Sequence, residues 1–417
     1  MIPILRIATL ALACASMGTA IGQDCFTVIA NPGEDASTQV RLNWHSPTVG
    51  NNACYVTLAT DAQWSNQRKF IASEQLITAF DSLPSKDKDG NDIIECPHFI
   101  RCALSLDSLM PGEKYMYKVG SEDGEIRYFK TAPQPNQPWT AAIISDFHAY
   151  LPNGGRQAAA MAMLDTLKSV NGGDFDMLLS VGDVCAWGGS YSFWQNLYDE
   201  PNFRQHLVAG VVGNHDYQSS GYEKDTNEFF RYANNNPDNG YDQQMGVCYH
   251  FTYGPCLFIM LNGECMATGG GLERAKVWIR EVLKRHDAKY VVLMEHYQWF
   301  YGKQGKDAQY ARWQSAFAEM GIDLAIGGNN HIYVRSHPLL NGKVATDGKG
   351  TICVQTPSSD NERGDDMGDL TSNAELIAAR WTEGPCTVGA MLMRYDGTRL
   401  TLTLYDRHGT PIDTVSL

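Results

Sequence analysis

Five short apolar segments in this 417-residue chain each run directly into a small group of Asp, Asn or His residues. Helix-like stretches separate the segments, and this alternation predicts a layered α/β domain. In an open α/β sheet, ligands bind beyond the carboxyl ends of the strands, so groups that follow several strands can converge on one crevice. The five groups are Asp146-Phe147-His148, Gly182-Asp183, Gly213-Asn214-His215-Asp216, His296 and Gly328-Asn329-Asn330-His331.

The side chains in these groups offer the oxygen and imidazole ligands that divalent metals such as zinc and manganese accept. Each residue alone has an ordinary explanation. An Asp after a strand often caps the next helix, Asn214 suits a turn, and a lone His usually has a protein partner. Five such groups at five strand ends are hard to explain as caps. The set therefore predicts a metal site.

The residue pattern changes near residue 135, from short alternating runs to apolar segments separated by helix-like stretches. This change predicts two domains after the first 22 residues. Residues 23–134 are predicted to form an all-β sandwich, because several short alternating runs are separated by turns. Residues 135–417 are predicted to form the α/β domain, with a closing hairpin around Asp396-Gly397. The main strands expected are 39–44, 54–58, 114–119, 125–131, 140–144, 177–181, 207–212, 257–261, 290–294, 324–326, 389–395 and 400–405, and the main helices 156–170 and 272–285.

The N-terminus has the pattern of a secretory signal peptide over residues 1–22. Arg6 precedes an apolar run over 7–20 that is short for a membrane span, and small residues follow. We expect a secreted or periplasmic protein without a transmembrane span, and Cys14 leaves a surface lipoprotein as an alternative. Ten cysteines remain after Cys14, an even number that permits disulfides in an exported chain, although their pairing does not follow from the sequence.

The net charge of −14 argues against a nucleic-acid polymer as partner. A phosphate-binding site in such an acidic chain needs a local positive field, and bound metal ions supply one.

The order of the motifs over residues 140–336 resembles the calcineurin-like metallophosphoesterases. It reads Asp-x-His, Gly-Asp, Gly-Asn-His-Asp, a later His, and Gly-x-x-His-x-Tyr-x-Arg. The segment 106–120 looks like the fibronectin type III-like domain that precedes purple acid phosphatases, and 402–417 looks like their C-terminal strands. The resemblance implies a layered β-sandwich flanked by helices, preceded by an all-β domain.

The resemblance also implies hydrolysis of a small-molecule or glycan-linked phosphate ester by a hydroxide held between two divalent metal ions. Asp183 resembles the carboxylate that bridges both ions. The first ion is expected on Asp146, His148 and His331, and the second on Asn214 and His296. His215 resembles the residue that contacts the phosphoryl group, beside Asn214, or protonates the leaving oxygen. Monoesters and diesters both stay open.

Two positions depart from the pattern. Purple acid phosphatases have a tyrosine where this chain has Ala186 and a glycine where it has His148, so a tyrosinate–iron centre is not expected. Manganese, zinc or ferrous iron suits the remaining ligands. Asn329 occupies the place of a usual His ligand, where it either offers a weaker oxygen or merely lines the pocket. The alternative function is therefore a metal-stabilised binding protein with weakened or lost catalysis.

Several other side chains have two interpretations. Asp216 either orients the His215 imidazole or is a turn carboxylate. Tyr333 and Arg335 either bind the phosphate or support the site by packing. Four aromatic residues either stack on a sugar or nucleoside leaving group or belong to the core, namely Trp187, Trp194, Tyr217 and Tyr297. A carbohydrate-adhesion module is a third function, resting only on the β domain and the aromatic residues.

Overall fold

The computed structural model describes residues 25–79, 81, 97–151, 154–217, 228–244, 246–266, 269–300, 309–360, 374–384 and 387–417. The predicted signal peptide, Cys96 and Cys386 lie outside these residues. The predicted domain boundaries at residues 22 and 134 stay predictions. Within the described part no helix is long and apolar enough to cross a membrane. No two of the eight cysteines described there form a disulfide with each other.

The N-terminal part is all-β, as predicted, and consists of two four-stranded antiparallel sheets with strand orders β1-β2-β6-β5 and β4-β3-β7-β8. Trp44, Tyr117 and Phe129 are buried in its core. Strand β1 was not predicted because it is buried along nearly its whole length and shows no alternation. The strands are β1 (Phe26–Pro32), β2 (Val40–Ser46), β3 (Ala53–Leu58), β4 (Arg68–Ile71), β5 (Ser73–Thr78), β6 (His98–Leu106), β7 (Lys114–Val119) and β8 (Arg127–Lys130).

A six-stranded sheet opens the second part, in the order β11-β10-β9-β21-β22-β23. Strands β9, β10 and β11 run parallel, and the predicted hairpin pairs β21 with β22 in antiparallel register, Tyr395 opposite Leu400. The strands are β9 (Trp139–Ile144), β10 (Met177–Ser180), β11 (Leu207–Gly210), β21 (Gly389–Tyr395), β22 (Leu400–Asp406) and β23 (Pro411–Ser416).

A seven-stranded sheet faces it, in the order β12-β13-β14-β15-β19-β16-β20. Strands β13, β14, β15 and β19 are parallel neighbours. The strands are β12 (Tyr249–Tyr253), β13 (Cys256–Met260), β14 (Tyr290–Met294), β15 (Leu324–Gly327), β16 (Tyr333–Ser336), β19 (Ile352–Gln355) and β20 (Ile377–Trp381), with a separate pair of β17 (Leu339–Leu340) and β18 (Lys343–Val344).

The two sheets form the inner layers of a four-layer sandwich, which confirms the predicted fold class. Alternate residues of β9 divide between two cores: Ala141 and Ile143 face the other sheet, whereas Ala142 and Ile144 face α1 and α2. Helices α6 and α7 cover the seven-stranded sheet. The helices are α1 (Gly155–Asn171), α2 (Tyr191–Tyr198), α3 (Pro201–Arg204), α4 (Glu228–Ala233), α5 (Gly263–Met266), α6 (Gly271–Leu283) and α7 (Tyr310–Met320), with 3₁₀ turns at Asp242–Gln244 and Ala374–Leu376.

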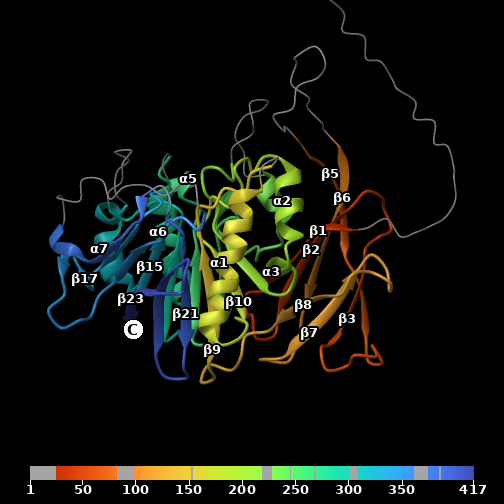
Figure 1. The fold of residues 1–417 in the computed structure, drawn as a ribbon, viewed down its shortest axis with the longest axis horizontal. Helices are drawn as coiled ribbons and strands as arrows, with labels where there is room; N and C mark the ends of the chain where they lie inside the picture. The colour runs from red at the N-terminus through yellow and green to blue at the C-terminus, as the bar shows by residue number, and fades with distance from the viewer. Residues whose placement is uncertain are drawn as a thin grey trace, which may run out of the picture.

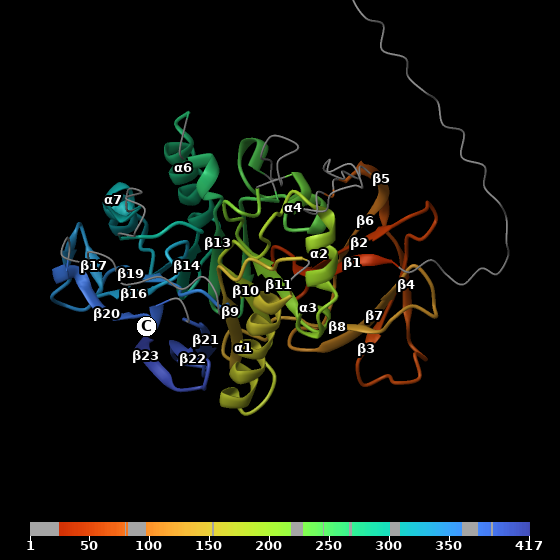
Figure 2. The same cartoon turned by 45° about the horizontal axis from the view of Figure 1, so that its top comes forward.

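Figure 1 shows the N-terminal strands, red to orange, at one side of the molecule and α6 and α7 towards the other. Figure 2, turned by 45°, shows the same order, with α1, α2 and α3 between these two groups. Strand β1 packs beside β11, and the Asn31 side-chain amide donates to the Val208 carbonyl at 2.9 Å. The N-terminal sheets therefore pack directly on the six-stranded sheet.

Candidate metal centre

The facing sheets bring the predicted polar groups together at the carboxyl ends of their strands. Asp146 follows β9, Asp183 follows β10 and Asn214 follows β11, three neighbouring parallel strands. His296 follows β14 and His331 follows β15, two neighbouring strands of the other sheet. These six side chains, Asp146, His148, Asp183, Asn214, His296 and His331, are called the strand-end cluster below.

The ligand atoms of this cluster lie close enough to share metal ions. Three sets each have all their ligand atoms within 4.8 Å of one another: Asp146 with His148 and His331, His148 with Asp183 and His215, and Asp146 with Asp183 and His296. Such overlapping sets of buried carboxylates and imidazoles are typical of metal binding.

Asp183 lies between two imidazoles. Its Oδ2 is 3.2 Å from Nε2 of His148 and 3.3 Å from Nε2 of His296. On the other side of the cluster, Oδ1 of Asp146 is 3.5 Å from Nε2 of His331 and 4.0 Å from Nε2 of His296. Asp183 thus has the position of a bridging carboxylate, while Asp146 also reaches both groups.

Backbone carbonyls hold the two innermost imidazoles. Nδ1 of His148 donates to the Asp146 carbonyl at 2.9 Å, and Nδ1 of His296 donates to the Val181 carbonyl at 2.8 Å. These bonds select the tautomer in which each Nε2 is turned to the carboxylates. Both rings are completely buried, so their Nε2 atoms are oriented before any ion arrives.

Glycines in the motifs are required by close backbone packing. A Cβ on Gly213 would lie 2.2 Å from Oδ1 of Asp183, and one on Gly328 would lie 2.6 Å from Oδ2 of Asp146. The ligands themselves have left-handed backbones, with φ of +51° at Asp146, +45° at His148 and +51° at Asp183. This conformation costs roughly 1–2 kcal/mol per non-glycine residue, so backbone strain is concentrated where the ligands converge.

The two buried carboxylates of the cluster need positive charge nearby to be ionised. Burial raises the pKa of Asp146, and the positive charges of His296 and His331 only partly offset this. Burial also opposes ionisation of Asp183, but His296 and His148 outweigh it and hold the pKa of Asp183 well below its usual range. Burial alone would lower the pKa of His296, yet Asp183 and Asp146 raise it to about 10.

One oxygen of the cluster lacks a partner. Oδ1 of Asn214 is buried and has no hydrogen-bond partner among the described residues. An unpaired buried oxygen costs on the order of 1–3 kcal/mol, and a metal ion would satisfy it. With two buried carboxylates and three imidazoles beside it, the donor set fits divalent cations.

His215 lies beside the strand-end cluster and is half-buried. Its backbone N–H donates to Oδ1 of Asp183 at 2.7 Å, and its Nδ1 donates to the Ala186 carbonyl at 3.1 Å. Its ring meets the His148 ring edge-on at 4.5 Å between centroids. The side chain is therefore fixed at the edge of the cluster, with Trp187 6.3 Å away on its other side.

Asp216 was predicted either to orient the His215 imidazole or to be a turn carboxylate, and the structure shows which groups its carboxylate binds. Its buried carboxylate accepts hydrogen bonds from four backbone amides, at 2.8–3.2 Å, those of Asp183, Val184, Cys185 and Gly213. Burial and the nearby Asp183 charge raise the pKa of Asp216 to about 7, against the lowering effect of these amides. Asp216 thus joins the loops after β10 and β11.

Tyr333 and Arg335 were predicted either to bind the phosphate or to support the site by packing, and both are paired with Asp413. The Tyr333 hydroxyl donates to Oδ2 of Asp413 at 2.8 Å, and Arg335 donates to both Asp413 oxygens at 2.6 and 3.1 Å. Asp413 belongs to β23 of the other sheet. Because these side chains extend from β16 to β23, they brace the two sheets, the supporting role that was the alternative.

Asn329 is next to Asp146, as the motif register predicts. Its backbone N–H lies 3.1–3.2 Å from the two Asp146 oxygens, and its side-chain amide nitrogen donates to Oε1 of Gln298 at 2.7 Å. The side-chain oxygen of Asn329, Oδ1, is the atom that could bind an ion.

The structure places one of the four aromatic residues in the core, and stacking of the other three on a leaving group stays a prediction. Trp194 is completely buried and its indole N–H donates to the Gly188 carbonyl at 2.7 Å, so it belongs to the core. Trp187, Tyr217 and Tyr297 are half-buried. The hydroxyl of Tyr217 is hydrogen-bonded to Asn262, and that of Tyr297 to Glu264.

A sixth polar group, Ser358-Ser359-Asp360, follows β19 and was not predicted from the sequence. The Ser358 hydroxyl donates to the Asp146 carbonyl at 2.9 Å, and Oδ2 of Asp360 lies 4.0 Å from Nδ1 of His148. The same signal was available, because β19 is a short apolar strand that ends in polar residues. Glu295 was also missed; its carboxyl is buried beside His296, and burial raises its pKa to about 8.

Comparisons with known proteins agree with this geometry. Residues 140–333 match the family model of the calcineurin-like phosphoesterases. The uncharacterized proteins MT2654 and Rv2577 of Mycobacterium tuberculosis are each 26% identical over 377 residues, covering 80% of this chain. The chain spans 66% of the length of these relatives.

Two solved structures have the same fold. Purple acid phosphatase PPD1 from yellow lupin (Lupinus luteus) seeds superposes with a TM-score of 0.70 at 16% identity, covering 94% of this chain and 74% of that one. PhoD superposes with a TM-score of 0.57 at 13% identity, covering 95% and 93%. The lupin match includes the N-terminal sheets. Residues 140–333 thus form a calcineurin-like phosphoesterase domain, within a chain that has a purple-acid-phosphatase-like architecture.

Proposed function

We propose that the protein hydrolyses phosphate esters at a site that holds two divalent metal ions. One observation carries the proposal: two carboxylates, three imidazoles and a buried, unpartnered amide oxygen converge from five strand ends. Asp146, His148 and His331 would hold one ion, Asn214 and His296 the other, and Asp183 both. When bound, the ions would offset the charge of the phosphoryl group and activate water for attack.

The protein's own contribution is orientation and proton transfer. His148 and His296 are held by backbone carbonyls, so little reorganisation is needed when substrate binds. The Nδ1 of His215 donates to the Ala186 carbonyl, which fixes the ring at the edge of the cluster, where the imidazole would contact a phosphoryl oxygen or donate a proton to the leaving group. The half-exposed ring suits such contact, since the fully buried imidazoles are not open to an ester.

Manganese, zinc or ferrous iron suits these ligands. Ala186 carries no side-chain donor and is buried, so no phenolate is available at the place where purple acid phosphatases have tyrosine. We propose that the metal-loaded protein is colourless in the visible range or only weakly absorbing. The substrate proposed is a small-molecule or glycan-linked ester, met outside the cytoplasm if residues 1–22 act as a signal peptide.

The test compares metal-stripped and reloaded protein on p-nitrophenyl phosphate and bis(p-nitrophenyl) phosphate. Turnover should be lost on chelation and return with manganese or zinc. Asp183→Asn and His215→Ala should each lower kcat by at least about a hundredfold, the usual size of an electrostatic or acid–base contribution. Asp347→Asn removes an exposed carboxylate and should leave kcat unchanged.

Asn329 favours a second candidate, a metal-stabilised binding protein. Its amide is a weaker donor than the imidazole usual at this position, and its nitrogen is already bound to Gln298. One tightly bound ion per chain, with no phosphate released from either ester under any metal, would support this candidate and reject hydrolysis.

A further inference from the structure

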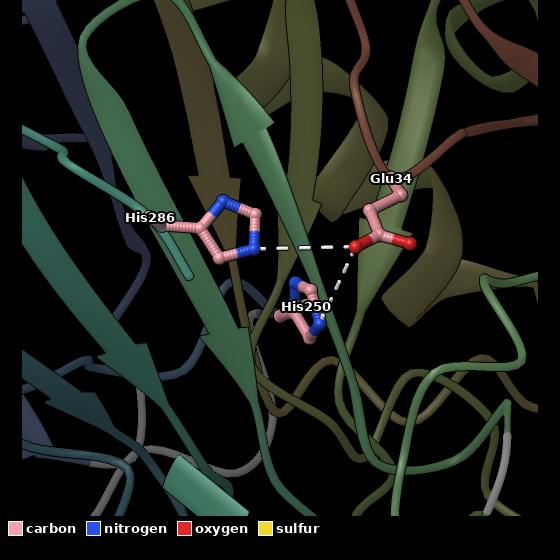
Figure 3. A group of neighbouring side chains, drawn as sticks. All are labelled: Glu34, His250 and His286. Atoms are coloured by element: carbon pink, nitrogen blue, oxygen red, sulfur yellow. Dashed lines mark ion pairs between the residues drawn. The ribbon is translucent and has the colours of Figure 1, made fainter. Parts of the chain in front are cut away.

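A second group of metal-ligating side chains lies outside the strand-end cluster. Glu34 is in the N-terminal part just after β1, His250 is on β12, and His286 follows α6. Figure 3 shows the three side chains converging, with one carboxylate oxygen of Glu34 facing both imidazoles. These residues, called the Glu34 cluster below, have their ligand atoms within 4.8 Å of one another.

The distances exclude hydrogen bonds within the Glu34 cluster. Oε1 of Glu34 is 3.8 Å from Nε2 of His250 and 3.9 Å from Nε2 of His286. Direct N–H···O bonds have heavy-atom distances near 2.7–3.2 Å. Glu34 therefore faces both imidazoles without a hydrogen bond to either, and the two rings meet edge-on at 4.9 Å between centroids.

His250 is the main evidence for a ligand. Its side chain is completely buried, yet neither ring nitrogen has a hydrogen-bond partner among the described residues, and Nε2 of His286 is also buried without one. Contrast His206, another buried histidine, whose nitrogens are paired with the Asn202 carbonyl and Asp174 at 2.7 and 2.9 Å. A buried imidazole left unpaired costs free energy, so His250 needs an explanation.

The imidazoles are suited to bind a cation because they are neutral. Burial lowers the pKa of His250 to about 3, with further lowering from His286 and Arg285. Burial also lowers the pKa of His286, and Glu34 opposes this. Arg285 opposes a cation, and the Glu34 carboxylate offsets its charge.

The backbone around the Glu34 cluster is rigid. The Asn239 side chain makes two hydrogen bonds to the His250 backbone, at 2.9 and 3.0 Å, and Trp278 packs 6.0 Å from the His250 ring. The Thr252 N–H donates to the Glu34 carbonyl at 2.8 Å, and the Ala36 N–H donates to the Thr252 carbonyl at 3.1 Å. Glu34 is thus paired to β12 by its backbone, while its side chain stays about half exposed.

We propose that Glu34, His250 and His286 bind a zinc-class divalent cation that links the N-terminal sheets to the metallophosphoesterase domain. Two imidazoles and one carboxylate form a ligand set that zinc accepts, with water in the fourth position. Tetrahedral zinc requires ligand atoms about 3.3–3.5 Å apart, from metal–ligand distances of about 2.0–2.2 Å. A small rotation of the exposed Glu34 side chain would shorten the 3.8 and 3.9 Å separations to this range.

The experiment counts zinc bound to the full-length protein after chelation, reloading with Zn²⁺ and desalting, by elemental analysis. His286→Gln and Glu34→Gln are compared with wild type and with His337→Gln, a half-buried histidine outside every group of ligand atoms found in the described residues. Each is measured alone and with Asp183→Asn, which weakens the strand-end cluster. His286→Gln should bind one zinc fewer than its parent in both backgrounds. Glu34→Gln should weaken the affinity for that zinc ion by at least tenfold, and His337→Gln should leave the zinc count unchanged.

Thermal unfolding gives a second measurement. In the Asp183→Asn background, added zinc should raise Tm by a few degrees, because an ion that binds only the folded chain stabilises it, and His286→Gln should abolish the rise. An equal zinc count with and without His286→Gln, in both backgrounds, would overturn the proposal. If the strand-end cluster bound no metal, wild type would hold one zinc and His286→Gln none, so the two proposals fail separately.

Discussion

Asn329 illustrates how a single residue can limit a metal site. It lies in the left-handed region, with φ of +69°, where Asn is tolerated better than most residues. Its side chain donates to Gln298 instead of providing an imidazole. The predicted consequence is two ions held with unequal strength, the ion on Asn214 and His296 being the weaker.

Asn329→His should tighten the weaker ion. An imidazole is a better donor than an amide oxygen, and we expect its dissociation constant to fall roughly tenfold to a hundredfold, the range seen when a metal site gains or loses a supporting partner. Calorimetric titration of the stripped protein with Mn²⁺ measures this. The metal-free variant should melt a few degrees lower, because His at a positive φ costs on the order of 1 kcal/mol.

Asn329→Ala is the matched control, since it removes the amide without adding a ligand. Equal affinities for the weaker ion in wild type, Asn329→His and Asn329→Ala would mean that residue 329 only lines the pocket.

At the scale of secondary-structure elements, side chains connect strand β16 to strand β23 of the other sheet. Asp413 accepts hydrogen bonds from Tyr333 and Arg335, and both of its partners lie on the opposite sheet. Burial alone would raise the pKa of Asp413, but these two donors outweigh burial and lower it. Folding therefore stabilises the ionised carboxylate.

Asp413→Asn should destabilise the fold without affecting catalysis. We expect a loss of about 1–2 kcal/mol at pH 7, since the bonds are charge-assisted but partly open to solvent. Because folding lowers the Asp413 pKa, its contribution is fully present above the ordinary value and is lost as the pH falls through the lowered one. The difference in stability between variant and wild type should therefore shrink in acid, as urea unfolding at several pH values would measure.

Arg335→Ala should behave like Asp413→Asn, and the two effects should not add, because one interaction is removed twice. A rise in KM for Arg335→Ala but not for Asp413→Asn would contradict the brace and support substrate binding.

The strands also show which elements a sequence pattern can reveal. Strands β7, β14 and β21 have the bounds predicted for them, 114–119, 290–294 and 389–395. Strand β1 was missed because contact with β11 buries both of its faces and removes the alternation. Strand β19 was missed as well, and with it the Ser358-Ser359-Asp360 group.

At the scale of the whole molecule, the two parts are joined by buried asparagines. The Asn235 side-chain nitrogen donates to the Leu42 and Leu104 carbonyls at 2.9 and 3.2 Å, and the Asn235 N–H donates to the Asn31 side chain at 2.8 Å. Arg101 donates to the Asn234 carbonyl at 2.7 Å. Such an interface is specific, because each polar group needs its partner once it is buried.

Asn235→Ala should destabilise the protein by about 2–4 kcal/mol, since it removes two hydrogen bonds to carbonyls in the buried interface. Both parts should still unfold in one transition, which calorimetry with fluorescence would detect as coincident midpoints. Asn236→Ala is the control, because the Asn236 side chain donates to the Gly246 carbonyl in its own domain at 3.0 Å. Equal losses for the two variants, or two separate wild-type transitions, would contradict a shared interface.

The sequence by itself determined the fold class, the family and the positions from which ligands come. Parallel strands are short apolar runs with polar residues at their carboxyl ends, and this local pattern predicted that Asp146, Asp183 and His296 converge. Their proximity follows from the facing of two sheets: β9 and β10 are neighbours in one sheet, β14 belongs to the other, and the carboxyl ends of all three strands lie together.

Only the tertiary structure decided what each polar group faces. Asp216 binds four amides and Arg335 binds Asp413, although both lie in the motifs, because a side chain's partners come from segments distant in sequence. The Glu34 cluster has no sequence signature for the same reason. Its residues are separated by more than 200 positions between Glu34 and His250, and they meet only because the N-terminal loop pairs with β12.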